Sequence, residues 1–93
     1  MKNFFELSAR FDARASFYGK AHVIINDDDS LTLRSYDTDI LTVDTSKRTI
    51  VKLWDSWSQT TGRHIIEFSK QYDLPIVNKR AFDVLPVNME ISY

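Results

Sequence analysis

The stretch TIVKLWDSWSQTTGRHIIEFSKQY, residues 49–72, contains the change from strand to helix on which the fold depends. Its first part, residues 49–54, alternates between the two sides of an extended chain, as a half-buried strand does. From residue 60 to residue 72 the apolar positions are instead spaced for about three turns of helix. Ser58 or Thr60 is the expected N-cap, because a hydroxyl there accepts a hydrogen bond from an unpaired backbone N–H.

The rest of the chain predicts three more strands and one more helix. With residues 49–54, the expected strands are residues 16–25, 31–36 and 39–43. Asn78 is the expected cap of a short helix over residues 78–85, which Pro86 ends. Short connections usually join neighbouring elements. The predicted fold is therefore α+β: a four-stranded antiparallel meander packed by one main helix, plus a short C-terminal helix.

Length and composition indicate one soluble domain over residues 1–93. Apolar residues make up 43% of the chain and charged residues 27%, as in ordinary globular proteins. Cysteine is absent, which excludes disulfides and thiolate metal sites. No apolar run approaches the roughly 20 residues that span a membrane. Glu6 interrupts the apolar stretch that a signal peptide needs, so we expect a cytoplasmic protein without a membrane partner.

No set of residues in the chain predicts catalysis or a cofactor. The histidines, His22 and His64, are far apart in sequence and have no partner at a metal-ligand spacing. Ser58, His64 and Asp55 are near one another in sequence, but nothing resembling a nucleophile elbow surrounds the serine. Two glycines are too few for a phosphate-binding loop. We therefore expect no enzyme activity, no metal and no cofactor.

The first candidate binding surface is acidic. Residues 26–44 carry six aspartates and one arginine, a net charge of −5, whereas the whole chain has a net charge of −1. We call these aspartates the acidic pole: Asp27, Asp28, Asp29, Asp37, Asp39 and Asp44. Aspartate also favours turns, so ordinary turn composition is an alternative explanation. As a binding surface, the acidic pole would face a basic partner.

The second candidate surface is one face of the sheet. If Phe17, Ala21, Val23, Leu31, Leu33, Val51 and Leu53 face the helix, the opposite face carries aromatic and basic side chains. We call this set the aromatic–basic face: Tyr18, Lys20, Arg34, Tyr36, Lys52 and Trp54, with His22 beside them. Single-stranded nucleic acids bind such faces, because bases stack on rings and cations hold phosphates. Alternatively, residues 1–12 fold back as a short helix or an extended arm and cover this face with Phe4, Phe5 and Phe11.

Three sequence blocks together resemble a known family. They are SFYGKA at residues 16–21, SYDT at residues 35–38 and WSQTTGRHIIEF at residues 57–68. The chain resembles, over about residues 15–70, an uncharacterised domain family of phages, plasmids and integrative elements of Gram-positive bacteria. The family usually has Asn where this chain has Asp37. The resemblance implies a mobile genetic element in a bacterial host cell, where small proteins often inhibit host defence, anti-CRISPR proteins among them; it implies no activity.

The third block predicts a structural motif that joins sheet to helix. Its members are Trp57, Thr60, Thr61, His64 and Phe68. An apolar residue before the cap, such as Trp57, can pack against the first helical turn. The alternative is an anion site, in which the helix N-terminus binds a phosphate with the help of Thr60, Thr61, Arg63 and His64.

Two functions follow as hypotheses. The first is a non-catalytic inhibitor that binds a host protein or nucleoprotein effector, a nucleic-acid-targeting defence complex, with its acidic pole. The second is a small accessory protein that binds nucleic acid with its aromatic–basic face. A homodimer formed through an uncovered sheet face or edge stays open beside both.

Overall fold

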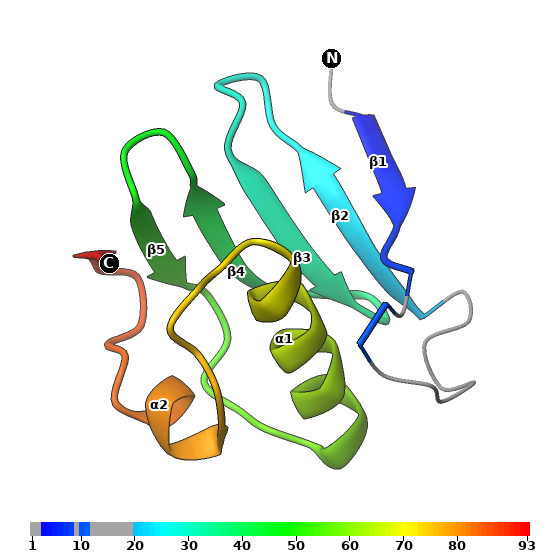
Figure 1. Ribbon diagram of the computed structural model, residues 1–93, viewed down its shortest axis with the longest axis vertical. Helices are drawn as coiled ribbons and strands as arrows, with labels where there is room; N and C mark the ends of the chain where they lie inside the picture. Colours follow the sequence, from blue (N-terminus) through cyan, green and yellow to red (C-terminus); the bar gives the residue numbers. More distant parts are fainter. Residues whose placement is uncertain (1–2, 9, 12–19) are drawn as a thin grey trace.

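A computed structural model describes residues 3–8, 10–11 and 20–93 of the chain. Its centre is an antiparallel sheet of six strands that lie in sequence order, β1-β2-β3-β4-β5-β6 (Figure 1). The strands are β1 (Asn3–Glu6), β2 (Ala21–Ile25), β3 (Leu31–Ser35), β4 (Thr38–Asp44), β5 (Thr49–Lys52) and β6 (Glu90–Ser92). The α+β class and the antiparallel sheet are thereby confirmed.

The expected number of four strands is wrong, because each edge of the meander gains one more strand. β1 pairs with β2, and β6 pairs with β5, which precedes it by some forty residues. Both added strands are short, so neither shows the alternation by which a strand is recognised in sequence. The strand expected at residues 16–25 is described from Ala21; residues 16–19 lie outside the described residues.

Two helices follow the meander, one main and one short, as expected. The main helix α1 (Gln59–Gln71) begins after Ser58, whose side chain accepts a hydrogen bond from the Thr61 backbone N–H at 3.0 Å. Of the two cap candidates, Ser58 is therefore the N-cap. The short helix α2 (Lys79–Asp83) is capped by Asn78, which accepts from the Ala81 N–H at 2.9 Å. None of the helices in the described part of the chain is long and apolar enough to cross a membrane.

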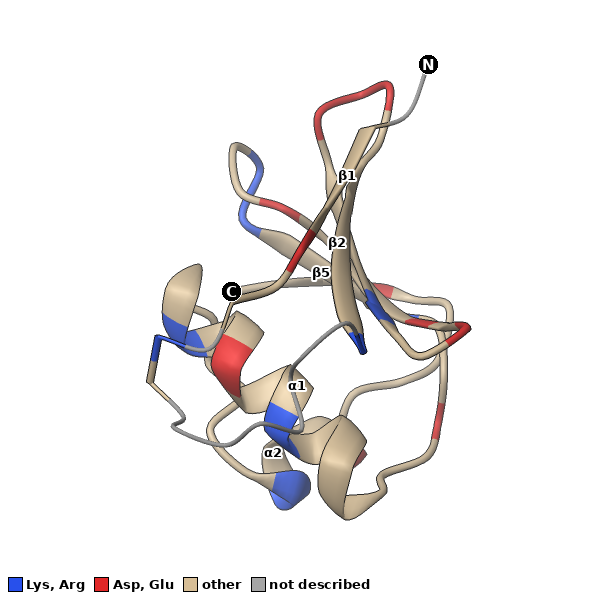
Figure 2. Ribbon diagram, turned by 90° about the vertical axis from the view of Figure 1, so that its right-hand side faces the viewer, with Lys and Arg blue, Asp and Glu red and all other residues tan. Residues whose placement is uncertain are grey.

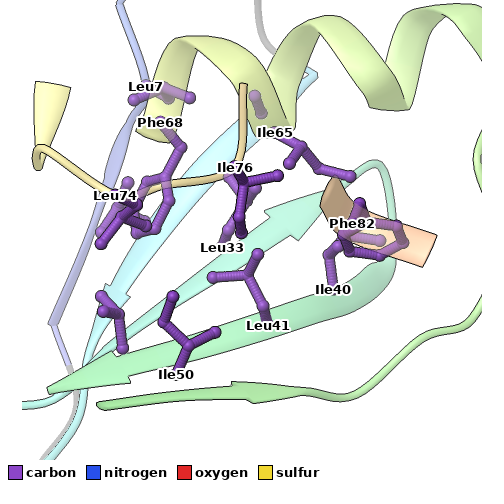
Figure 3. Close-up of a cluster of buried hydrophobic side chains, with 13 residues drawn as sticks. Leu7, Leu33, Ile40, Leu41, Ile50, Ile65, Phe68, Leu74, Ile76 and Phe82 are labelled. Carbon is purple, nitrogen blue, oxygen red and sulfur yellow. The ribbon is translucent and has the colours of Figure 1, made fainter. Parts of the chain in front are cut away.

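Both helices lie on one face of the sheet and enclose the core between themselves and the strands (Figures 1 and 3). The buried apolar cluster consists of Leu7, Ala21, Val23, Leu33, Ile40, Leu41, Val43, Ile50, Ile65, Phe68, Leu74, Ile76 and Phe82. Phe68 points from α1 into this space, and Phe82 brings α2 onto it. The opposite face of the sheet, which we call the open face, carries neither helix (Figure 2).

Strand β5 faces the core with the opposite set of residues from the one expected. Val51 and Leu53 are only half-buried, whereas Ile50 and Lys52 are each 1% exposed. The cause is the pairing with β4, in which Leu41 stands opposite Lys52 and Thr42 opposite Val51. Directly opposite residues of antiparallel strands point to the same face. Leu41 is buried in the core, so Lys52 faces the core with it.

Candidate functional site

The three sequence blocks meet at one end of the sheet, where β3 ends. Ser35 Oγ lies 2.8 Å from Nδ1 of His64 and 3.0 Å from Oγ1 of Thr61, both on α1. Ala21 pairs with Ser35 across the strands, and the Tyr36 N–H donates to the Lys20 carbonyl at 2.7 Å. The last residues of the first block, the second block and the start of α1 are thus bonded together.

These contacts turn the polar groups of the helix start inward. Ser35 and His64 are buried, and the Thr61 hydroxyl is bonded to Ser35. A nucleophilic serine and its base must be reachable by a substrate, and burial removes the Ser35–His64 pair from that role. Because the Thr61 and His64 side chains are bonded to Ser35, they do not point outward to the anion site that was considered for this helix N-terminus. The arrangement instead fixes α1 to the end of β3.

Trp57 packs directly over the first turns of α1. A Cβ placed on Gly62 would collide with the ring of Trp57, so the indole lies against the bare glycine backbone. The same ring lies 5.5 Å from that of Phe82, centroid to centroid, which connects α1 to α2. Trp57 immediately precedes the cap Ser58, and an apolar residue there commonly packs on the fourth helical position. That position is Gly62, where only glycine leaves room for an indole.

The acidic pole is divided between the two ends of the sheet. Asp27, Asp28 and Asp29 form the turn between β2 and β3, at the top of Figure 2, and all three are exposed. Asp44 ends β4 at the same end of the strands, beside the turn that carries Lys47 and Arg48. Asp37 and Asp39 lie at the opposite end, where β3 turns into β4. The six aspartates therefore do not form one continuous surface.

Two of these carboxylates, Asp28 and Asp44, also accept hydrogen bonds within their own turn. Asp28 Oδ1 accepts from the hydroxyl of Ser30 at 2.6 Å and from its backbone N–H at 3.0 Å. These two bonds lower the pKa of Asp28 below its ordinary value. Asp44 accepts from the backbone N–H groups of Ser46 and Lys47, at 3.0 and 2.9 Å. Their local role is the turn chemistry typical of aspartate.

The aromatic–basic face does not exist as expected, because its central lysine is buried. Lys52 lies on the helix side, where its Nζ donates to the Phe82 carbonyl at 3.0 Å and to Asp55 Oδ1 at 2.9 Å. The same nitrogen lies 4.5 Å from the centre of the Phe82 ring. A lysine can bury its apolar stem in this way when its charged end finds partners. This side chain closes α2 onto β5 and is not available to a phosphate.

The other members of that set are dispersed. Arg34 Nε donates to Asp39 Oδ1 at 2.7 Å, and this bond raises the pKa of the guanidinium. Lys20, Tyr36 and Trp54 are exposed. Tyr18 lies outside the described residues. The arginine thus keeps its charge but shares it with a neighbouring carboxylate.

The described residues of the N-terminal segment, 3–8 and 10–11, do not cover the open face. It adds β1 at the edge of the sheet, and Phe4 stands opposite Ile24 on the open face with 71% of its surface exposed. Phe5, one position further on, points to the helix side. Phe11 lies beside α1, where its N–H donates to Oε1 of the buried Glu67 at 2.8 Å. The expected cover by Phe4, Phe5 and Phe11 is therefore wrong.

A shallow hollow lies on the open face where β1, β2 and β3 adjoin. It has a volume of about 160 Å³ and is lined by Phe4, His22, Ile24, Arg34, Tyr36 and Asp37. The rings of Phe4 and His22 meet edge to face with centroids 5.9 Å apart and form one wall. Ile24 is almost fully buried although it belongs to the open face. The hollow thus has aromatic and aliphatic side chains together with charged ones.

Tyr36 reaches this hollow from a strained backbone. It follows β3 in a two-residue turn and adopts a φ of 55°, which a bulky residue rarely takes. Turns of this kind favour glycine at such a position, and the left-handed conformation costs about 1–2 kcal/mol. The ring packs 6.0 Å from His64 and is 49% exposed. Strain of this type is concentrated at functional sites, which makes Tyr36 a candidate contact residue.

Sequence reasoning missed Phe4 and Ile24 as members of a site and took Phe4 for part of a cover. The signal in the sequence was Phe4 itself, which stands beside Phe5 near the N-terminus. Within the described ranges, which omit residues 1–2, 9 and 12–19, no group of three His, Asp or Glu side chains is placed to hold a metal ion.

Comparison with known proteins gives one match. A model described as "Family of unknown function (DUF8033)" matches residues 5–84, most of the chain. The chain belongs to this family. No curated protein and no solved structure matches.

Proposed function

We propose that this protein is a non-catalytic binding module that binds a basic protein partner. The more specific part of the proposal, the identity of the partner, comes from the resemblance to mobile-element proteins. The partner is a host complex that targets nucleic acid, and binding inhibits it in the bacterial cytoplasm. The family to which the chain belongs has no described function, so it is compatible with this proposal and does not identify the partner.

The observation that carries the proposal is that two basic side chains of the sheet, Lys52 and Arg34, are already bonded within the protein. A nucleic-acid face needs free cations beside its aromatic rings. Lys52 is 1% exposed and already bonded, and Arg34 is held by Asp39. Exposed rings remain at Tyr36 and Trp54, but their basic companions are largely lost. Exposed rings with few free cations suit a protein partner better than a phosphate backbone.

The acidic hairpin tip supports the same conclusion. Asp27, Asp28 and Asp29 project at the end of the β2–β3 hairpin, where a phosphate backbone would be repelled (Figure 2). Proteins that bind nucleic acid offer cationic surfaces, and complementary charge steers an inhibitor toward them. The aspartates lie at both ends of the sheet, so such a surface would be approached by one acidic end and not by all six aspartates together.

The test compares the two ligand classes directly. Purified protein is titrated with single-stranded DNA and RNA at low salt, and the immobilised protein is exposed to lysate of a bacterial host with and without nuclease. We expect no nucleic-acid binding, together with a protein partner that is retained after nuclease treatment and whose nucleic-acid-cleaving activity falls when the protein is added. Tight binding of single strands that is lost in Tyr36→Ala would instead establish the accessory nucleic-acid-binding role. Sedimentation of the free protein tests the homodimer.

A further inference from the structure

We infer that the hollow on the open face is an anchor site for one cationic side chain, an arginine of the protein partner. The inference rests on the proposed function and specifies the chemistry of its contact. It follows from the shape of the hollow, its aromatic walls and its charge.

The size of the hollow fits a single side chain. Its volume is about 160 Å³, and a cavity of about 150 Å³ accommodates one benzene molecule. A strand or a helix would need a long groove, whereas a hollow this small takes one projecting group. Side chains that fill such central pockets contribute much of the affinity of protein interfaces, and arginine is among those enriched there.

The walls of the hollow include aromatic rings, to which a cation is attracted. Phe4 stands at the sheet edge with most of its surface exposed, and Tyr36 lines the hollow from its strained turn. A guanidinium over an aromatic face gains about 0.5–2 kcal/mol, depending on how far it is desolvated. Arginine also has an aliphatic stem, which can pack on Ile24 at the floor. Both parts of an arginine side chain therefore find partners here.

The charge around the hollow favours a cation over an anion. Arg34 lines it, but Asp39 holds its guanidinium at 2.7 Å. Asp37 also lines it and makes no hydrogen bond or ion pair within the described part of the chain, although Arg34 lies close enough to feel its charge. Glu6 stands opposite His22 and faces the same side. These three carboxylates outnumber Arg34 and the exposed Lys20, so an incoming carboxylate or phosphate would meet net repulsion.

The experiment uses a probe that needs no identified partner. The pentapeptide Gly-Gly-Arg-Gly-Gly, blocked at both ends, is titrated into the isotope-labelled protein at pH 7.5 and followed by backbone amide NMR shifts. The matched control replaces arginine by citrulline, which has nearly the same shape and no charge; a glutamate peptide is the third arm. We expect millimolar binding of the arginine peptide, with shifts centred on residues 22–24 and 34–37. The citrulline peptide should bind about tenfold more weakly.

Three variants separate the contribution of the aromatic rings from that of side-chain volume. Phe4→Leu removes the exposed ring and should weaken the arginine peptide about threefold or more, whereas Phe4→Tyr keeps the ring and the affinity. Tyr36→Gly removes the other ring and also suits the positive φ, so we expect the fold to be retained and the arginine peptide to bind more weakly. Equal binding of arginine and citrulline, shifts outside the hollow, or tighter binding of glutamate would overturn the inference.

The outcomes also distinguish this inference from the proposed function. Retention of a basic protein partner by both the wild type and Phe4→Leu, with no peptide binding, would refute the anchor site alone. Binding of the arginine peptide by a protein that recognises single-stranded nucleic acid and no protein would refute the proposed function and leave the arginine site standing.

Discussion

Ser35 Oγ lies 2.8 Å from Nδ1 of His64, and this bond joins the last residue of β3 to α1 across 29 positions of sequence. Both side chains are buried, and Thr61 completes the cluster from the first turn of the helix. The bond holds the first turns of α1 against the end of β3. It also fixes the end of β3, from which Tyr36 enters the hollow.

Ser35→Ala is expected to lower the free energy of unfolding by about 1–3 kcal/mol, because it leaves buried polar groups without their partner. Urea denaturation followed by circular dichroism measures the change. Ser56→Ala is the matched control, because Ser56 is exposed, and it should change stability by less than about 0.5 kcal/mol. Equal effects of the two substitutions would show that the Ser35–His64 bond contributes little.

Gly62→Ala is expected to destabilise the protein by about 1–3 kcal/mol, because the new methyl group collides with Trp57. Helix propensity alone predicts the opposite, a gain of about 1 kcal/mol. Thermal unfolding therefore distinguishes the two explanations by the sign of the change in stability. In a Trp57→Leu background the cost of Gly62→Ala should shrink, and a cost that stays unchanged there would contradict the explanation.

Lys52→Ala is expected to cost about 2–4 kcal/mol, because it empties space in the core and breaks the bonds that hold α2. Lys52→Met keeps the volume of the stem and should recover at least half of this loss. Both values come from chemical denaturation. A nearly neutral Lys52→Ala with weakened binding of single-stranded nucleic acid would contradict the buried position and restore Lys52 to a binding face.

Asp28 is expected to titrate below its ordinary pKa of 3.8, because ionised Asp28 accepts two hydrogen bonds from Ser30. A depressed pKa stabilises the fold at pH values above 3.8, and this contribution is lost as the pH falls through the lower, folded-state value. NMR titration of the Asp28 carboxyl carbon measures the midpoint. Ser30→Ala should raise that midpoint; the same midpoint in both proteins would refute the hydrogen-bond explanation.

Replacing Asp27, Asp28 and Asp29 together by Asn tests whether the acidic hairpin tip steers binding. Asn retains turn propensity and tolerates the left-handed φ of 68° at Asp29. We expect a slower association with the protein partner and a weaker dependence of that rate on salt. Stopped-flow or surface-based kinetics at two salt concentrations provide the measurement. An unchanged rate would remove this tip from the binding surface and leave the hollow as the candidate contact.

The sequence by itself determined the local elements of this fold. Alternation predicted β3 and β4 to within a residue or two, and the period change after residue 54 predicted α1. The sequence predicted Asn78 as one cap and narrowed the other to Ser58 or Thr60, because a cap depends on groups only three residues apart; the structure selects Ser58. Such features are decided by near neighbours, and near neighbours are visible in sequence.

Only the tertiary structure decided the number of strands, the inward face of β5 and the place of the N-terminal segment. β1 and β6 are too short to carry a period and exist through pairing with distant strands. In β5 both alternating sets contain apolar residues, so the pairing of Leu41 with Lys52 selected the set that faces the core. The hollow brings Phe4 next to residues from 22 to 37 through the long-range pairing of β1 with β2. Its formation depends on strand register, which no local pattern in this chain specifies.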